Sequence, residues 1–250
     1  MNNKNTRNGL VSISFRKHTP REILLAMRSA DLRYIEWGSD IHAPANDLEK
    51  IGEVARLQAE YGIECSSYGT YFRLGETPIS ELPSYIAAAK ILGTSLLRLW
   101  CGTKSGAETT EEEKEKLFSA CKEAAEIAER EEVTLALECH VKTFTERPED
   151  ALLLMKEINS PHLQMYWQPN QFRREEENLA SAKMLSPYVR VVHVFNWERE
   201  QKKPLCEAVE IWKKYLSCFD GSQKLLLEFM PCGRLDELSA EAHSLKKIAE

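Results

Sequence analysis

The stretch LALECH, residues 135–140, joins an apolar run to a carboxylate, Glu138, and an imidazole, His140. Residues two apart on a β-strand point to the same side, so both groups would leave the strand end together. Three later stretches repeat this pattern, because each is an apolar run that closes with one polar group. They are MYWQPN (165–170) with Gln168, VVHVFNW (191–197) with His193, and LLLEFM (225–230) with Glu228. If these strand ends converge, their oxygen and nitrogen atoms form a cluster of metal-site size.

The composition is ordinary for a globular protein. The 250 residues (28.6 kDa) are 43% hydrophobic and 29% charged, with a net charge of −6 and a pI near 5.7. An acidic chain is a poor general binder of phosphate backbones, so we expect no nucleic-acid partner. Neither a signal-like segment nor an apolar run of membrane-spanning length occurs, and the seven cysteines form no CxxC pair. These features predict a cytoplasmic protein with no membrane partner and no disulfide framework.

Strand-like apolar runs alternate with helical patterns along the whole chain. We expect strands at residues 9–15, 34–37, 63–68, 95–101, 133–139, 163–167, 189–195 and 224–229. Each is followed by an amphipathic pattern typical of a helix, and residues 1–8 are expected to form a flexible N-terminal segment. Eight such units predict one (β/α)8 TIM barrel domain over residues 1–250. The alternative fold is an open doubly wound sheet, in which a glycine-rich phosphate loop is expected. The sequence has no GxGxxG motif and no P-loop.

A TIM barrel has its active site at the C-terminal ends of its strands. Two carboxylates, an amide oxygen and an imidazole suit a divalent cation of the Mn, Co, Mg or Fe type better than a thiolate zinc site. Each of these four residues, taken singly, is also typical of a helix or strand cap or of core packing. Their matching positions at the ends of four successive strands favour a functional site. The first four strands contribute a more scattered set: Arg16, Lys17, His18, Glu36, Asp40, His42, Tyr68, Tyr71, Arg98 and Trp100.

The predicted chemistry is proton transfer beside a carbonyl. A metal ion would polarise that carbonyl, and Glu138 and Glu228 would remove and return the proton. His140 is expected to orient the substrate, with donation to a neighbouring carboxylate as the alternative. Trp100 and Tyr68 are candidates for an apolar wall against a sugar ring, although aromatic residues at strand ends also serve as packing.

In the order and spacing of these residues, the chain resembles the xylose-isomerase-like barrels, which include sugar-phosphate isomerases, ketose 3-epimerases and inosose dehydratases. The resemblance implies a divalent metal (Mn, Co, Mg or Zn) and the acid/base role of the two glutamates, and it implies a substrate contact for Arg199. It also implies four metal ligands, which are Glu138, Gln168, His193 and Glu228. Two departures from the family pattern are Gln168, in place of an aspartate, and Gln171, in place of a histidine. The lost negative charge at Gln168 predicts weak metal binding.

The resemblance therefore predicts a metal-dependent isomerase or epimerase that acts on a small sugar or sugar phosphate. Exposed helix faces are compatible with a homodimer. One alternative is a dehydratase on the same scaffold, which would expel a hydroxyl group. Another is a carbohydrate-binding barrel that has lost its metal. A DNA-cleaving barrel is disfavoured, because the strand ends SSYGTY (66–71) and LRLWCG (97–102) lack the histidines and carboxylates that three zinc ions need.

Overall fold

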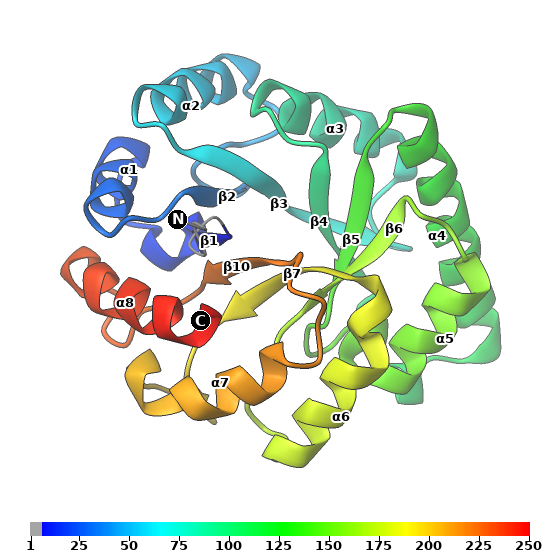
Figure 1. The fold of residues 1–250 in the computed structure, drawn as a ribbon. Helices are drawn as coiled ribbons and strands as arrows, with labels where there is room; N and C mark the ends of the chain where they lie inside the picture. The colour runs from blue at the N-terminus through cyan, green and yellow to red at the C-terminus, as the bar shows by residue number, and fades with distance from the viewer. Residues whose placement is uncertain (1–6) are drawn as a thin grey trace.

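A computed structural model describes residues 7–250 of the chain. Within these residues, eight parallel strands close into a barrel in the order β1-β10-β7-β6-β5-β4-β3-β2 (Figure 1). The predicted (β/α)8 barrel is therefore confirmed. The barrel strands are β1 (Asn8–Val11), β2 (Tyr34–Gly38), β3 (Glu64–Leu74), β4 (Leu96–Cys101), β5 (Thr134–Glu138), β6 (Leu163–Trp167), β7 (Val189–Val194) and β10 (Lys224–Leu227).

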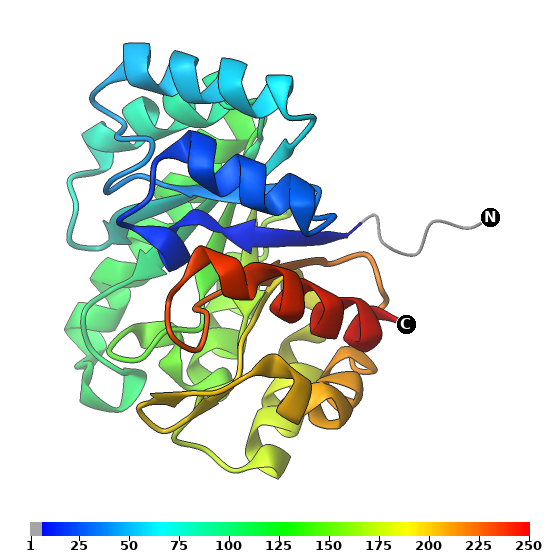
Figure 2. The same cartoon turned by 90° about the vertical axis from the view of Figure 1, so that its left-hand side faces the viewer.

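A helix follows each barrel strand and packs on the outside of the sheet (Figures 1 and 2). The first begins with a capping box, in which Thr19 and Glu22 each accept the other's backbone N–H. The helices are α1 (Pro20–Ser29), α2 (Leu48–Glu60), α3 (Leu82–Ile91), α4 (Glu111–Arg130), α5 (Pro148–Ile158), α6 (Glu175–Leu185), α7 (Val209–Leu216) and α8 (Leu238–Ala249).

The main differences from the sequence-based expectation concern the first strand, the third strand and a short hairpin. The first strand ends at Val11 rather than at residue 15, because residues 12–15 form a 3₁₀ turn, η1 (Ser12–Phe15), whose Ser12 Oγ accepts the Gly38 N–H at 2.9 Å. The third strand continues to Leu74 through an irregularity in its register. A short hairpin, β8 (Trp197–Glu198) with β9 (Gln201–Lys202), was not predicted. The expected flexible segment lies mostly outside the described residues, and its last residue, Asn8, begins β1.

Successive side chains along each strand point to opposite faces of the sheet, so the barrel has two apolar layers. One lies between the sheet and the helices, and a smaller one fills the barrel interior with residues such as Ile13, Tyr166 and Leu226. The Tyr166 ring packs edge-on against the His193 ring, with centroids 5.0 Å apart. The interior layer therefore forms a packed floor beneath the C-terminal mouth of the barrel.

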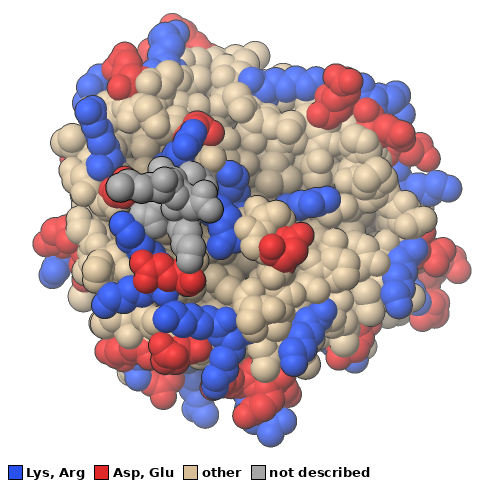
Figure 3. All heavy atoms as spheres, in the orientation of Figure 1, with Lys and Arg blue, Asp and Glu red and all other residues tan. Residues whose placement is uncertain are grey.

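The start of β1 and the end of α8 lie at the end of the barrel opposite that mouth (Figure 2). Lysine, arginine and acidic side chains are interspersed over the face shown in Figure 3. Within residues 7–250, no helix has the length and apolarity needed to span a bilayer. All seven cysteines are free.

Candidate functional site

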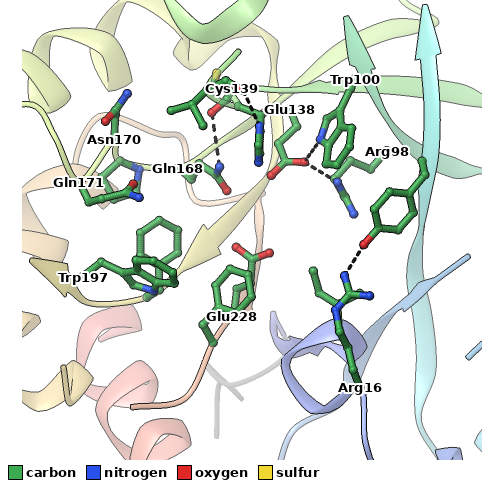
Figure 4. A pocket seen from close by; sticks show the side chains of 17 residues that line it. Arg16, Arg98, Trp100, Glu138, Cys139, Gln168, Asn170, Gln171, Trp197 and Glu228 are labelled. Atoms are coloured by element: carbon green, nitrogen blue, oxygen red, sulfur yellow. Dashed lines mark hydrogen bonds and ion pairs between the residues drawn. The ribbon is translucent and has the colours of Figure 1, made fainter. Parts of the chain in front are cut away.

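A cavity of about 340 Å³ opens at the C-terminal mouth of the barrel (Figure 4). Its polar lining comes from strands far apart in the sequence. Arg98 lies on β4, Glu138 ends β5, and Gln168 and Glu228 directly follow β6 and β10. This is the end of a TIM barrel at which active sites are found.

The four strand-end groups that the sequence singled out lie around one point. One donor atom from each of Glu138, His193 and Glu228 lies within 4.8 Å of the other two, and all three residues are buried. His193 Nδ1 is 3.8 Å from Glu138 Oε1 and 3.5 Å from Glu228 Oε2. Gln168 Oε1 lies 3.1 Å from the same nitrogen. Three oxygens thus surround one imidazole nitrogen.

This donor set fits a divalent cation. Ligands about 2.1 Å from a metal ion lie roughly 3.0–3.4 Å from one another, so the Glu138 and Glu228 oxygens would each need to approach His193 Nδ1 by only a few tenths of an ångström. The buried charges also fit, because Glu36, Glu138 and Glu228 bring three negative charges and Arg98 one positive charge. When all three carboxyl groups are ionised and His193 is neutral, a divalent ion would balance the net negative charge that Arg98 leaves uncompensated.

Arg98 joins two buried carboxylates across the barrel mouth, a role that was not predicted from the sequence. Its Nε donates to Glu36 Oε1 at 2.8 Å, and its Nη1 donates to Glu138 Oε2. The guanidinium is only 2% exposed, and Glu36 is fully buried. The sequence signal was a charged residue inside each of two apolar strands, YIEWG (34–38) and LLRLWC (96–101). The opposite signs of these two charges would have been the clue to their pairing.

The two glutamates that were predicted to act as a matched pair differ electrostatically. Burial raises the pKa of Glu228 to about 7, with the Glu138 carboxylate adding to this shift and His193 opposing it. Burial also acts to raise the pKa of Glu138, but the Arg98 guanidinium, together with His193, His140 and the Trp100 hydrogen bond, outweighs it and holds that pKa below its usual value. Trp100 Nε1 donates to the Glu138 oxygen that Arg98 contacts, at 2.6 Å. Glu138 is therefore held as a carboxylate, whereas Glu228 can gain or lose a proton near neutral pH.

His193 lies between these carboxylates. Burial alone would lower the pKa of its imidazole, but the charges of Glu228, Glu36 and Glu138 outweigh this effect and raise it. Without a metal ion, the cluster therefore favours a proton on the ring, and a bound cation would compete with that proton.

Two predicted substrate contacts, Trp100 and His140, line the cavity. Their ring centroids are 4.9 Å apart, and the Arg73 guanidinium lies 4.2 Å from the Trp100 centroid. His140 Nδ1 is 2.7 Å from the Val141 carbonyl oxygen, which can only accept a hydrogen bond. The Nδ1 atom therefore carries the proton, and Nε2 of neutral His140 has a free lone pair.

Two other predicted contacts, Tyr68 and Arg199, do not line the cavity. Tyr68 is buried in the layer between sheet and helices, where its hydroxyl donates to the Ala43 carbonyl at 2.5 Å. The reason is that β3 continues beyond Tyr68 to Leu74, and Tyr71 of the same strand reaches the cavity instead. Arg199 is exposed between β8 and β9. That hairpin contributes Trp197 to the cavity rather than its arginine.

The chain turns sharply where Glu228 meets the cavity. Phe229, the next residue, has a φ of 59°, a left-handed conformation that is uncommon for a bulky residue. Its N–H donates to Ser14 Oγ in η1 at 2.9 Å, and its ring packs 5.3 Å from that of Trp197. A side-chain bond from the first unit of the barrel thus secures the turn that follows Glu228.

These features define a class, the α/β barrels with carboxylate and imidazole groups gathered at the C-terminal mouth. A family model described as "Xylose isomerase-like TIM barrel" matches residues 24–221. The chain therefore belongs to the xylose isomerase-like TIM barrel family, as its resemblance to these barrels predicted. A search of curated proteins finds no match.

Solved structures with the same fold have low sequence identity to this chain. "The probable 3-DHS dehydratase AsbF involved in the petrobactin synthesis from Bacillus anthracis" is 18% identical, with a TM-score of 0.79 over 96% of this chain and 99% of that one. An L-ribulose 3-epimerase is 15% identical, with a TM-score of 0.75 over 97% and 94%. A xylose isomerase-like barrel protein from Mycobacterium smegmatis, in complex with magnesium, is 14% identical, with a TM-score of 0.67 over 100% and 97%. At these identities the comparisons establish the fold alone.

Proposed function

We propose that this protein is a metal-dependent isomerase or epimerase that moves a proton at the carbon beside the carbonyl of a small carbohydrate. The observation that carries the proposal is the convergence of Glu138, His193 and Glu228 at the cavity, with Gln168 Oε1 beside His193 Nδ1. A divalent ion held by these four residues would polarise a substrate carbonyl and make the neighbouring C–H more acidic.

In this proposal the two glutamates have different roles. Glu228 removes the proton from the carbon and returns it, since it is the carboxylate of the cluster that Arg98 does not contact. Glu138 stays ionised beside Arg98 and supplies negative charge to the metal site. His140 offers a second proton acceptor through Nε2, which its bond to Val141 leaves free.

The cavity supports a small polar substrate with an apolar face. Its volume of about 340 Å³ is at the small end of the usual range for ligand sites. Trp197, Phe195 and Phe229 line one part of it, and Arg16, Gln168 and Asn170 are among its polar groups. A sugar combines hydroxyl groups with a C–H face that packs on aromatic rings, and the names of several related structures refer to sugars.

The arrangement of Glu138 also favours a second candidate, a dehydratase. With one carboxyl group held by Arg98, Glu228 alone could take the proton from carbon and pass it to a hydroxyl group leaving from the same face. The C–H and C–O bonds break, a C=C bond forms and water departs. Epimerisation instead needs a second proton-transfer group on the opposite face, a role that His140 would fill when its Nε2 is protonated.

The test begins with metal content. Purified protein reconstituted with Mn²⁺ or Co²⁺ should bind about one ion per chain. The loaded protein is then incubated in D₂O with a panel of ketoses and inososes, and the products are followed by NMR. Deuterium incorporation with an altered stereocentre or carbonyl position supports an isomerase or epimerase, whereas loss of water supports the dehydratase. No metal binding and no exchange would overturn the proposal and favour a carbohydrate-binding barrel.

A further inference from the structure

The side of His193 that faces away from the ligand cluster points at another carboxylate. His193 Nε2 is 3.6 Å from Glu36 Oε2, and both side chains are fully buried. Among the described residues, Nε2 has no hydrogen-bond partner. A buried ring nitrogen without a partner is costly, and a small shift of either side chain would close this gap to a hydrogen bond.

Glu36 is held from two other directions. Arg98 Nε donates to its Oε1 at 2.8 Å, and Ser67 Oγ donates to its Oε2 at 3.1 Å. Arg98 also donates a hydrogen bond through Nη1 to Glu138 Oε2. A continuous chain of charged groups therefore runs from the β5 ligand through Arg98 and Glu36 to the β7 ligand.

The backbone of β3 leaves room for this chain at Gly69. A Cβ atom at this position would lie 2.5 Å from Glu36 Oε1 and 2.9 Å from Arg98 Nη2. Both distances are shorter than a Cβ contact allows, so any residue larger than glycine would displace the Glu36 and Arg98 side chains. The close approach of Gly69 is a second, independent sign that the barrel is built around this ion pair.

We infer that Glu36 is a positioning residue for the metal centre, and this inference rests on the proposed metal-dependent function. Nδ1 is the nitrogen of His193 that faces Glu138, Gln168 and Glu228, so the ring must carry its proton on Nε2 when it binds a metal ion. Glu36 accepts that proton in a hydrogen bond and fixes both the tautomer and the ring orientation. Arg98 keeps Glu36 in place and leaves Glu138 Oε1 as the oxygen free to bind the ion.

The test compares the metal affinity of the full-length protein with that of Glu36→Gln. Removal of a partner of this kind lowers metal affinity by about 10- to 100-fold, so calorimetric titration with Mn²⁺ should show a loss in that range. In Zn²⁺-loaded protein, ¹H–¹⁵N spectra of labelled histidine should assign the proton of His193 to Nε2 in the wild type. The Nε2–H resonance should lose its downfield shift in the variant, a change that reduced stability alone would not cause.

A matched control is Gln58→Leu. Gln58 accepts from Trp37 Nε1 and donates to the Leu92 carbonyl, both at 2.8 Å, in the layer outside the same strand. This variant should lose stability but keep the wild-type Mn²⁺ affinity. If Glu36→Gln does not fold, Ser67→Ala removes one of the bonds to Glu36 without a change of charge, and its Mn²⁺ affinity should fall about two- to tenfold.

The outcomes separate the two proposals. If the wild type binds Mn²⁺ and Glu36→Gln binds it equally well, the role of Glu36 is refuted while the proposed function stands. The same conclusion follows if Ser67→Ala, used in its place, keeps full affinity. If the wild type binds no Mn²⁺, both proposals fail.

Discussion

Glu36 on β2 and Glu228 after β10 are both buried glutamates beside His193, yet their pKa values are shifted in opposite directions. Burial acts to raise the pKa of Glu36, but Arg98 and His193 bring it down to about 2, whereas burial raises the pKa of Glu228 to about 7. Arg98 contacts Glu36 directly but not Glu228. The early strands therefore carry fixed charges that hold the site, and the last strand carries a group that can exchange a proton.

The largest expected effect is a loss of activity in Glu228→Gln, which should differ from Glu138→Gln in its effect on stability. Glu228→Gln removes the proposed base, so we expect the turnover number to fall by about 10²- to 10⁴-fold with little change in the free energy of unfolding. Glu138→Gln should also lose activity, but it should lose stability as well, because Arg98 is left with one carboxylate partner. Steady-state kinetics and urea unfolding of both variants test this. A Glu228→Gln variant with wild-type turnover would remove the distinction.

The next largest effect should come from Arg98→Met. Two buried carboxylates lose their cation, and breaking a buried ion pair costs about 3–5 kcal/mol in the free energy of unfolding. The matched control is Arg33→Met, which breaks an ion pair with Glu64 between two half-exposed side chains. That change should cost at most about 1 kcal/mol. Equal losses in urea unfolding would show that the buried pair has no special role.

A smaller effect is expected from Gly69→Ala. The added methyl group would meet the Glu36 and Arg98 side chains, and overpacking of this kind costs about 1–3 kcal/mol. Gly52→Ala on α2 is a suitable control, because its nearest neighbour within 4 Å is the end of the Arg56 side chain. Gly52→Ala should be neutral or slightly stabilising, since alanine favours helices. Thermal unfolding of both variants would show whether the space beside β3 is required.

The smallest effect concerns Glu241 on α8, a buried carboxyl group that accepts the Leu205 N–H but has no cation beside it among the described residues. Burial raises its pKa to about 7. Because the folded state then binds the proton more tightly than the unfolded state, stability should fall as the pH rises from about 4.5 to 7. Glu241→Gln should remove this loss and stabilise the protein at pH 8 by about 1–2 kcal/mol. Melting temperatures from pH 5 to pH 8 test the sign, and parallel curves would contradict it.

The barrel and the second half of its mouth could be predicted because their signals are local. Each apolar run that ends in a polar residue, such as the one before Glu138 or Glu228, reports both a strand and the position where that strand ends. The TIM barrel topology then brings these ends together without any further information.

The first half of the mouth could not be predicted in the same way. Glu36 and Arg98 are 62 residues apart, and the role of each depends on its ion pair with the other, which no local pattern reports. Tyr68 was misplaced because an apolar run does not show where an irregular strand such as β3 stops. The β8–β9 hairpin is too short for a periodic signal, so Trp197 was not recognised as part of the cavity.

The turn at Phe229 has a consequence for protein design. A grafted copy of this mouth that kept Glu228 but not Ser14 would leave the chain free to relax from the left-handed conformation at Phe229, which costs roughly 1–3 kcal/mol to maintain. Ser14, at the other end of the sequence, supplies the bond that secures that conformation. The smallest transferable unit therefore includes both ends of the chain, and a circular permutation that preserves the Ser14 contact should keep it intact.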